Sequence, residues 1–293
     1  MIPVTTIGGY LGAGKTTVVN HMLRHANGAR LAILVNEFGQ LAIDEDLIIA
    51  QGDEMISIAG GCICCSFGDN LVGAMMDLAA LDPAPDHIVI EASGVAIPGA
   101  IAASISLLPG FRHDGIIVLA DAETIRARAG DKYVGDTILR QLADADIVLL
   151  TKTDLVAPAA LDDTTQWLAT QSPAARILPI TGGRIAPAIL LDRFARLAPY
   201  ETSPHADHLF ESLTLPIHAP VDATALAQAL VNPAFGIVRA KGHVTGPAGD
   251  KWLIQIVGQR FDVTRSDIDA PDQIVCIGLT GQIDKPAIQK LNP

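Results

Sequence analysis

The chain has 293 residues, enough for about two domains of ~150 residues that each bury a core. Hydrophobic residues make up 49% of the sequence and charged residues 18%, a composition typical of a folded globular protein and not of a disordered one. The net charge of −12 repels nucleic-acid backbones and anionic lipid surfaces. Apolar runs such as residues 116–120 are far shorter than the ~20 residues of a membrane-spanning helix. We therefore expect neither a nucleic-acid nor a membrane partner.

Up to about residue 195, short aliphatic runs alternate with longer stretches of helical character. The runs are almost uninterrupted by polar residues, as is typical of parallel strands covered by helices on both faces. They are residues 4–7, 31–35, 87–91, 115–120, 146–150 and 176–180. This alternation predicts an α/β fold with a doubly wound, mostly parallel sheet. An insert over residues 48–66 contains glycine turns around one short extra strand, residues 54–58.

The pattern changes after a stretch rich in Pro, Ala and Gly at residues 182–207. Beyond it, a helix is predicted over residues 222–230, with Asp222 as its N-cap. The predicted strands of this part are residues 210–215, 236–240, 252–257, 261–264 and 273–278. We therefore expect one domain over residues 1–190, a linker over 191–207 and a smaller α+β domain over 208–293.

The first candidate site is the segment Gly-Tyr-Leu-Gly-Ala-Gly-Lys-Thr at residues 9–16. It fits the phosphate-loop pattern G-x-x-x-x-G-K-[ST] and lies between a predicted strand and a predicted helix. In such a loop, backbone N–H groups surround the β-phosphate, the lysine contacts the β- and γ-phosphate oxygens and the threonine hydroxyl ligates Mg²⁺. The segment predicts a nucleoside triphosphate site of the P-loop NTPase type. Its residues are Gly12, Ala13, Gly14, Lys15, Thr16 and Thr17, the last near the α-phosphate.

A second motif, Thr151-Lys152-Thr153-Asp154, follows a predicted buried strand and indicates which base is bound. It resembles the N-K-x-D motif of GTPases, with Thr151 in place of asparagine. A carboxylate at Asp154 can accept hydrogen bonds from both N1–H and the exocyclic amine of guanine, and adenine offers no such pair of donors. The motif therefore favours GTP over ATP, while the loss of the asparagine amide removes one of the two hydrogen bonds it could make.

Binding of Mg²⁺ and hydrolysis of the triphosphate require carboxylates near the γ-phosphate. In an α/β fold of this type, such residues lie at the carboxyl ends of the strands. Glu91 ends the predicted strand 87–91, and Gly94 just after it could donate its N–H to the γ-phosphate. Glu37 follows the strand 31–35 in a loop expected to lie over the phosphates, and Asp44 is a third, weaker candidate. We expect Thr16, Glu37 and Glu91 to bind Mg²⁺, and Lys15, Glu37 and Glu91 to serve hydrolysis.

Three of the four cysteines stand together as Cys62-Ile63-Cys64-Cys65, and Cys276 stands alone in a strand-like run. This distribution is not that of a disulfide framework, and together with a start that lacks the basic region of a signal peptide it predicts the reducing cytoplasm. Soft thiolates suit Zn²⁺ or another late transition ion. Three ligands leave a fourth position open, which favours a site that exchanges its metal. A redox pair and buried small side chains are the alternative interpretations of the cluster.

The order of these motifs resembles that of the CobW family of P-loop GTPases, relatives of the GTPases that insert nickel into urease and hydrogenase. The resemblance covers the phosphate loop, Asn-Glu-Phe-Gly, Gly-Gly-Cys-Ile-Cys-Cys, Glu-Ala-Ser-Gly, Thr-Lys-Thr-Asp and, in the small domain, Arg-Ala-Lys-Gly at residues 239–242. It implies a metallochaperone that hydrolyses GTP slowly and delivers its metal to a client metalloenzyme or metal-insertion complex. It also implies that Cys62, Cys64 and Cys65 hold the transported ion, with Zn²⁺ expected first and Co²⁺ next.

Two other hypotheses remain open on the sequence: a P-loop kinase of small molecules, in which Asp154 is incidental, and a redox-sensing nucleotide switch, in which the cysteines form a disulfide. A second copy of the chain, in a homodimer, is a further candidate partner. The sequence does not name the client, and thiolate donors alone do not identify the metal, because they also serve Ni²⁺ and Cu⁺.

Overall fold

The computed structural model describes residues 1–26, 28–35, 48–51, 55–58, 62–66, 70–191 and 209–291, and in the three short ranges between 48 and 66 only the backbone is described. The chain divides into two compact units, Met1–Asp192 and Arg193–Pro293. Glu37 and Asp44 lie outside the described residues. None of the described helices is long and apolar enough to cross a lipid bilayer.

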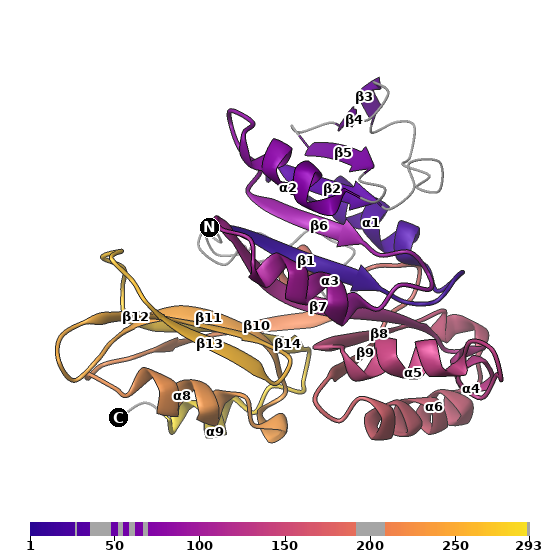
Figure 1. Ribbon diagram of the computed structural model, residues 1–293. Helices are drawn as coiled ribbons and strands as arrows, with labels where there is room; N and C mark the ends of the chain where they lie inside the picture. Colours follow the sequence, from indigo (N-terminus) through magenta and orange to yellow (C-terminus); the bar gives the residue numbers. More distant parts are fainter. Residues whose placement is uncertain are drawn as a thin grey trace. The chain divides into compact units, whose positions relative to one another are not determined.

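The described strands of the first unit form a nine-stranded sheet in the order β3-β4-β5-β2-β6-β1-β7-β8-β9. From β5 to β9 neighbouring strands are parallel, whereas β4 pairs antiparallel with both β3 and β5 (Figure 1). The strands are β1 Ile2–Gly8, β2 Leu31–Val35, β3 Ile48–Gln51, β4 Met55–Ile58, β5 Cys62–Ser66, β6 His87–Glu91, β7 Phe111–Asp121, β8 Ile147–Thr151 and β9 Arg176–Pro179. The doubly wound, mostly parallel α/β fold is therefore confirmed.

Helices cover both faces of this sheet because alternate residues of its strands are buried in opposite directions. On one face, Val4 and Ile88 pack in a cluster with Met75 of α2 and Ile105 of α3. On the other face, the buried Thr5 hydroxyl donates to the carbonyl oxygen of Leu190 in α7 at 2.9 Å. The helices are α1 Lys15–Arg24, α2 Leu71–Ala79, α3 Pro98–Ser106, α4 Ile125–Ala129, α5 Gly135–Ala143, α6 Pro158–Gln171 and α7 Pro187–Leu190.

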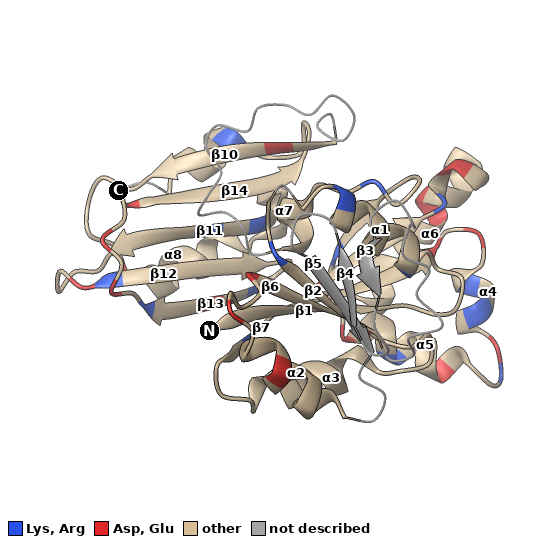
Figure 2. Cartoon of the chain, turned by 90° about the horizontal axis from the view of Figure 1, so that it is seen from above, with Lys and Arg blue, Asp and Glu red and all other residues tan. Residues whose placement is uncertain are grey.

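The expected strands at 31–35 and 87–91 match β2 and β6 residue for residue. The expected strand at 115–120 is longer, since β7 begins at Phe111 and ends at Asp121. The insert holds three strands where one was predicted, because β4 is flanked by β3 and by β5, which carries the cysteine cluster. Charged side chains are absent from β1 and β2 and are found on outer elements such as α4, which bears Arg126 and Arg128 (Figure 2).

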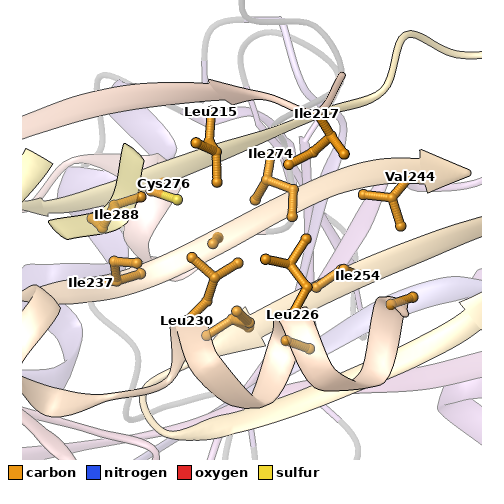
Figure 3. Packing of buried hydrophobic residues seen from close by; sticks show 14 of the residues in the cluster. Leu215, Ile217, Leu226, Leu230, Ile237, Val244, Ile254, Ile274, Cys276 and Ile288 are labelled. Carbon is orange, nitrogen blue, oxygen red and sulfur yellow. The ribbon is translucent and has the colours of Figure 1, made fainter. Parts of the chain in front are cut away.

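The second unit is an antiparallel sheet in the order β10-β14-β11-β12-β13, covered by helices on one face. Its elements are β10 Phe210–Pro216, α8 Ala223–Leu230, β11 Ile237–Thr245, β12 Lys251–Val257, β13 Arg260–Arg265, β14 Gln273–Leu279 and α9 Lys285–Gln289. Asp222 caps α8 as predicted, and its carboxylate accepts from the backbone N–H groups of Thr224 and Ala225. Leu226 and Leu230 of α8 point at the sheet, among Leu215, Ile274 and Cys276 (Figure 3).

We expect Leu230→Ala to lower the free energy of unfolding of the second unit by about 3 kcal/mol, because the side chain is fully buried and its loss leaves a cavity. Urea denaturation followed by Trp252 fluorescence in a Trp167→Phe background would report this unit. The matched control is Ile268→Ala, which truncates an exposed side chain of the same unit and should change stability by less than about 0.5 kcal/mol. Equal effects of the two substitutions would contradict the assignment of this core.

Candidate nucleotide and metal site

The phosphate-loop segment connects β1 to α1, as its motif predicts. Gly12 and Gly14 have φ angles of 78° and 96°, a region that side chains disfavour, which explains the glycines at these positions. Gly9 packs against the backbone of β7, where a Cβ atom would lie 2.5 Å from the carbonyl oxygen of Leu119, so only glycine fits at this position. The loop is therefore built to turn sharply and to present its N–H groups ahead of the N-terminus of α1.

Lys15 and Glu91 form the charged centre of the site. The Lys15 side chain is 9% exposed and its Nζ donates to the carbonyl oxygen of Gly9 at 2.8 Å. Burial lowers the pKa of Lys15, an effect that the nearby Glu91 carboxylate opposes. Burial raises the pKa of Glu91, which Lys15 in turn opposes. The two groups therefore compensate each other's burial only in part.

Within the part of the chain that the structure describes, one oxygen of the Glu91 carboxylate is free to bind a metal ion. Its Oε2 is buried and has no hydrogen-bond partner among the described residues. Leaving such an oxygen unpaired is costly, and a carboxylate oxygen is the donor that Mg²⁺ prefers. With Thr16 at the start of α1 as a second oxygen donor, the residues present here fit a Mg²⁺ ion bound together with nucleotide phosphates.

The guanine-type motif begins at the end of β8. The buried Thr151 hydroxyl lies 2.9 Å from the carbonyl oxygen of Ala13 in the phosphate loop and 3.2 Å from that of Ala120 in β7. The hydroxyl proton of Thr151 is therefore donated to a backbone carbonyl of the protein. Through this bond Thr151 connects the base motif to the phosphate loop. Lys152 has a left-handed backbone conformation (φ 56°), and its Nζ lies 2.6 Å from Oδ2 of Asp121. Asp154 follows in an exposed turn of 3-10 helix.

The loop that follows Glu91 packs directly on the phosphate loop. A Cβ at Gly94 would lie 2.7 Å from side-chain atoms of Leu11 and 2.9 Å from its backbone nitrogen. On its other side, Nε2 of Gln141 in α5 donates to the carbonyl oxygens of Gly94 and Ala96, at 3.1 and 2.8 Å. Gly94 is therefore held between the nucleotide loop and α5.

The cysteine cluster lies in β5, two strands away from Glu91. In the backbone register, Val35 of β2 pairs with Ser66 of β5 on one side and with Glu91 of β6 on the other. Cys65 and Cys64 pair with Leu34 and Ile33, one and two residues before that row. Neighbouring strands lie about 4.8 Å apart, so the backbones of the cysteine strand and the Glu91 strand are separated by roughly 10 Å.

Sequence reasoning missed two residues of this site, Asp121 and Gln141. The signal for Asp121 was present, since it follows the aliphatic run 116–120 and thus stands at the carboxyl end of a strand. Gln141 carried no local signal, because its partners are 45 and 47 residues away in the sequence. Among the side chains that the structure describes, no group of three or more His, Cys, Asp and Glu is arranged to hold a metal, and the three clustered cysteines are not part of that set.

The fold and the loop geometry define this chain as a P-loop nucleotide-binding protein. Residues 3–179 match the CobW/HypB/UreG nucleotide-binding domain, and residues 210–291 match the cobalamin synthesis protein cobW C-terminal domain. The chain belongs to the CobW family. This membership confirms the resemblance drawn from the motifs.

Several relatives share this architecture. The zinc chaperone CobW of Sinorhizobium sp is 31% identical over 89% of this chain and 86% of its own length, and that of Pseudomonas aeruginosa is 31% identical over 89% and 82%. The zinc chaperone YjiA of Escherichia coli is 35% identical over 65% of this chain and 61% of its own length. The crystal structure of the Zn(II)-bound YjiA GTPase from E. coli aligns with a TM-score of 0.54 and 27% identity, covering 99% of this chain and 97% of that one. A Zn(II)-bound triple mutant of the YjiA GTPase, with one glutamate and two cysteines changed to alanine, aligns with the same TM-score.

Proposed function

We propose that this protein is a GTP-dependent metal chaperone that carries Zn²⁺ as its cargo and hydrolyses GTP slowly to time its release to a client metalloenzyme. Family membership and the relatives described as zinc chaperones support the class and the metal. Co²⁺ is the second candidate cargo. In this proposal Cys62, Cys64 and Cys65 supply the thiolates, and the client supplies the ligands that complete the transfer.

The observation that carries the proposal is the row of paired backbone positions that joins Ser66, Val35 and Glu91. Strands that share backbone hydrogen bonds move together more readily than separate loops do. A change at Glu91 on triphosphate binding can therefore bias the neighbouring cysteine strand, which is the physical requirement for coupling between two ligands.

Each residue of the nucleotide site has a role in GTP binding and hydrolysis. Lys15 neutralises charge on the β- and γ-phosphates, Thr16 and Glu91 hold Mg²⁺ together with Glu37, and Gly94 offers its N–H to the γ-phosphate. When bound, Mg²⁺ stabilises the negative charge that develops on the phosphate oxygens. Lys152 and Asp154 hold guanine, while Thr151 keeps their strand end fastened to the phosphate loop.

The decisive experiment is a zinc titration with a competing chelator in the presence of Mg²⁺ and either a non-hydrolysable GTP analogue or GDP. We expect zinc to bind at least about tenfold more tightly in the triphosphate state, a coupling of typical size. Affinity must be measured instead of occupancy, because a triple mutant of the YjiA GTPase, with one glutamate and two cysteines changed to alanine, is also Zn(II)-bound. Equal zinc affinities in the two nucleotide states would contradict the proposal, and a parallel titration with Co²⁺ ranks the two candidate metals.

A change of base preference tests the guanine assignment. Asn in place of Asp154 offers one acceptor and one donor, so it pairs with N1–H and the 2-oxo group of xanthine and no longer with the amine of guanine. We expect Asp154→Asn to lower GTP affinity at least about tenfold and to raise XTP affinity. Competition binding with a fluorescent nucleotide measures both values. Asp162→Asn, on the exposed side of α6, is the matched control; wild-type binding of ATP as tight as that of GTP would instead favour the kinase hypothesis.

A further inference from the structure

The segment that follows Glu91 is held by α5 and not only by its own loop. Gln141 lies on α5 and is 1% exposed, so its amide has no access to solvent. Its Nε2 donates to Gly94 and Ala96, which uses both protons of the amide nitrogen. A buried amide is stable only with such partners, so the position of Gln141 and the path of the loop depend on each other.

The carbonyl groups that Gln141 binds set the direction of the neighbouring N–H groups. Because a trans peptide unit is planar, fixing the carbonyl of Gly94 also fixes the orientation of the Val95 N–H, and fixing that of Ala96 orients the Ile97 N–H. These peptide groups lie within six residues of Glu91. The two bonds therefore hold the loop around Gly94, whose own N–H is the proposed donor to the γ-phosphate, in one arrangement before a phosphate binds, so that little reorganisation is needed when it arrives.

A second bond, made by the residue that follows α5, fixes the far end of the same segment. Oδ2 of Asp144 accepts from the backbone N–H of Gly99 in the first turn of α3, at 2.9 Å. A Cβ at Gly99 would lie 2.4 Å from Asp144, so the approach is close. Together with the contact between Gly94 and Leu11, the loop is held at three places, one on α5 and one at the residue that follows it.

We propose that Gln141 is a positioning residue for GTP hydrolysis: by binding the carbonyls of Gly94 and Ala96, it holds the loop after Glu91 against the phosphate loop in the arrangement that receives the γ-phosphate. This proposal rests on the proposed function, since it presumes that GTP is the nucleotide hydrolysed. Gln141 does not contact the reacting atoms. It acts through Gly94, and α5 becomes the element that sets the geometry of the loop.

The test replaces Gln141 by methionine, which has the same length and a good helix propensity but cannot donate. We expect kcat for GTP hydrolysis to fall about tenfold or more, because small misplacement of a positioned group has a large effect on rate. The Kd for GDP should stay within about twofold, since GDP has no γ-phosphate for the loop to receive. A structural role alone would lower thermal stability without this split between kcat and GDP binding.

Ser172→Ala is the matched control. The Ser172 hydroxyl is also buried and donates to a carbonyl of α5, that of Leu142, at 2.8 Å, but it does not touch the loop. We expect this variant to lose a comparable amount of stability and to keep kcat within about twofold. Gln141→Leu, which also fills the site with an apolar side chain that cannot donate, serves as a second variant with the same expected fall in kcat if Gln141→Met does not fold.

The outcomes separate the two proposals. If wild-type protein hydrolyses GTP and both folded Gln141 variants keep its kcat, the role of Gln141 is overturned and the proposed function stands. If Ser172→Ala lowers kcat as much as Gln141→Met, the effect is one of general stability and the positioning role is overturned too. If the wild type itself does not hydrolyse GTP, the proposed function fails and this inference fails with it.

Discussion

Replacing Lys15 by alanine is expected to reduce GTP hydrolysis at least about a thousandfold and to weaken GTP binding by more than tenfold. The Lys15 ammonium is the buried cation of the phosphate loop, and its Nζ donates to the carbonyl oxygen of Gly9. Preorganised positive charge at the transferred phosphoryl group is a major part of catalysis in P-loop enzymes. Its removal also leaves the carboxylate of Glu91 without the charge that offsets its burial.

Single-turnover hydrolysis and equilibrium nucleotide binding would measure the two effects separately. Lys132→Ala is the matched control, because Lys132 is exposed and its side chain lies over the Tyr133 ring instead of in the loop. Its removal changes the net charge by the same amount, so it corrects for any long-range electrostatic effect. A Lys15→Ala protein that still hydrolyses GTP at the wild-type rate would show that this loop is not the triphosphate site.

Replacing Cys64 by serine is expected to weaken zinc binding in the GTP-bound protein by about a hundredfold or more. A thiolate is a far better ligand for Zn²⁺ than a hydroxyl, and a site with three cysteines cannot replace the missing donor from its own set. The nucleotide affinity should change much less, because the change is made on β5 and not in the phosphate loop. Zinc competition assays in the presence of a GTP analogue would report the first effect and nucleotide titration the second.

The remaining cysteine provides the control for this experiment. Cys276 is buried among aliphatic side chains in the core of the second unit, and this burial raises the pKa of its thiol to about 12. Cys276→Ala should therefore leave zinc affinity unchanged while it lowers stability modestly. If Cys64→Ser binds zinc as tightly as Cys276→Ala does, the transported ion is held elsewhere.

Much of the fold could be predicted from the sequence because the signals were local. The strands β2 and β6 each contain an uninterrupted aliphatic run, and their predicted limits matched the structure. Asp222 was predicted as a cap because a carboxylate ahead of an apolar helix satisfies free N–H groups within three residues. The strand at Cys62–Ser66 was missed, because its strand character depends on pairing with β2 and β4 and not on its own residues.

The site was predictable to the extent that its motifs are contiguous. Residues 9–16 and 151–154 were found because each motif occupies one short segment at the end of a strand. The part played by Thr151 was not foreseeable in the same way: the motif identified it only as a substitute for asparagine, and the structure shows its bond to Ala13. The roles of Glu37 and of the cysteine side chains stay predictions.

The sequence by itself determined the class of this protein, since the phosphate loop, the base motif and the cysteine cluster each depend on residue types at fixed spacing. Only the tertiary structure decided how these segments are connected. It brought Gln141 to Gly94, Lys152 to Asp121 and Thr151 to the phosphate loop, across 31 to 138 residues of chain. The physical reason is that a hydrogen bond between distant residues is specified by packing of the whole sheet and its helices, and it leaves no periodic or local signal in either segment.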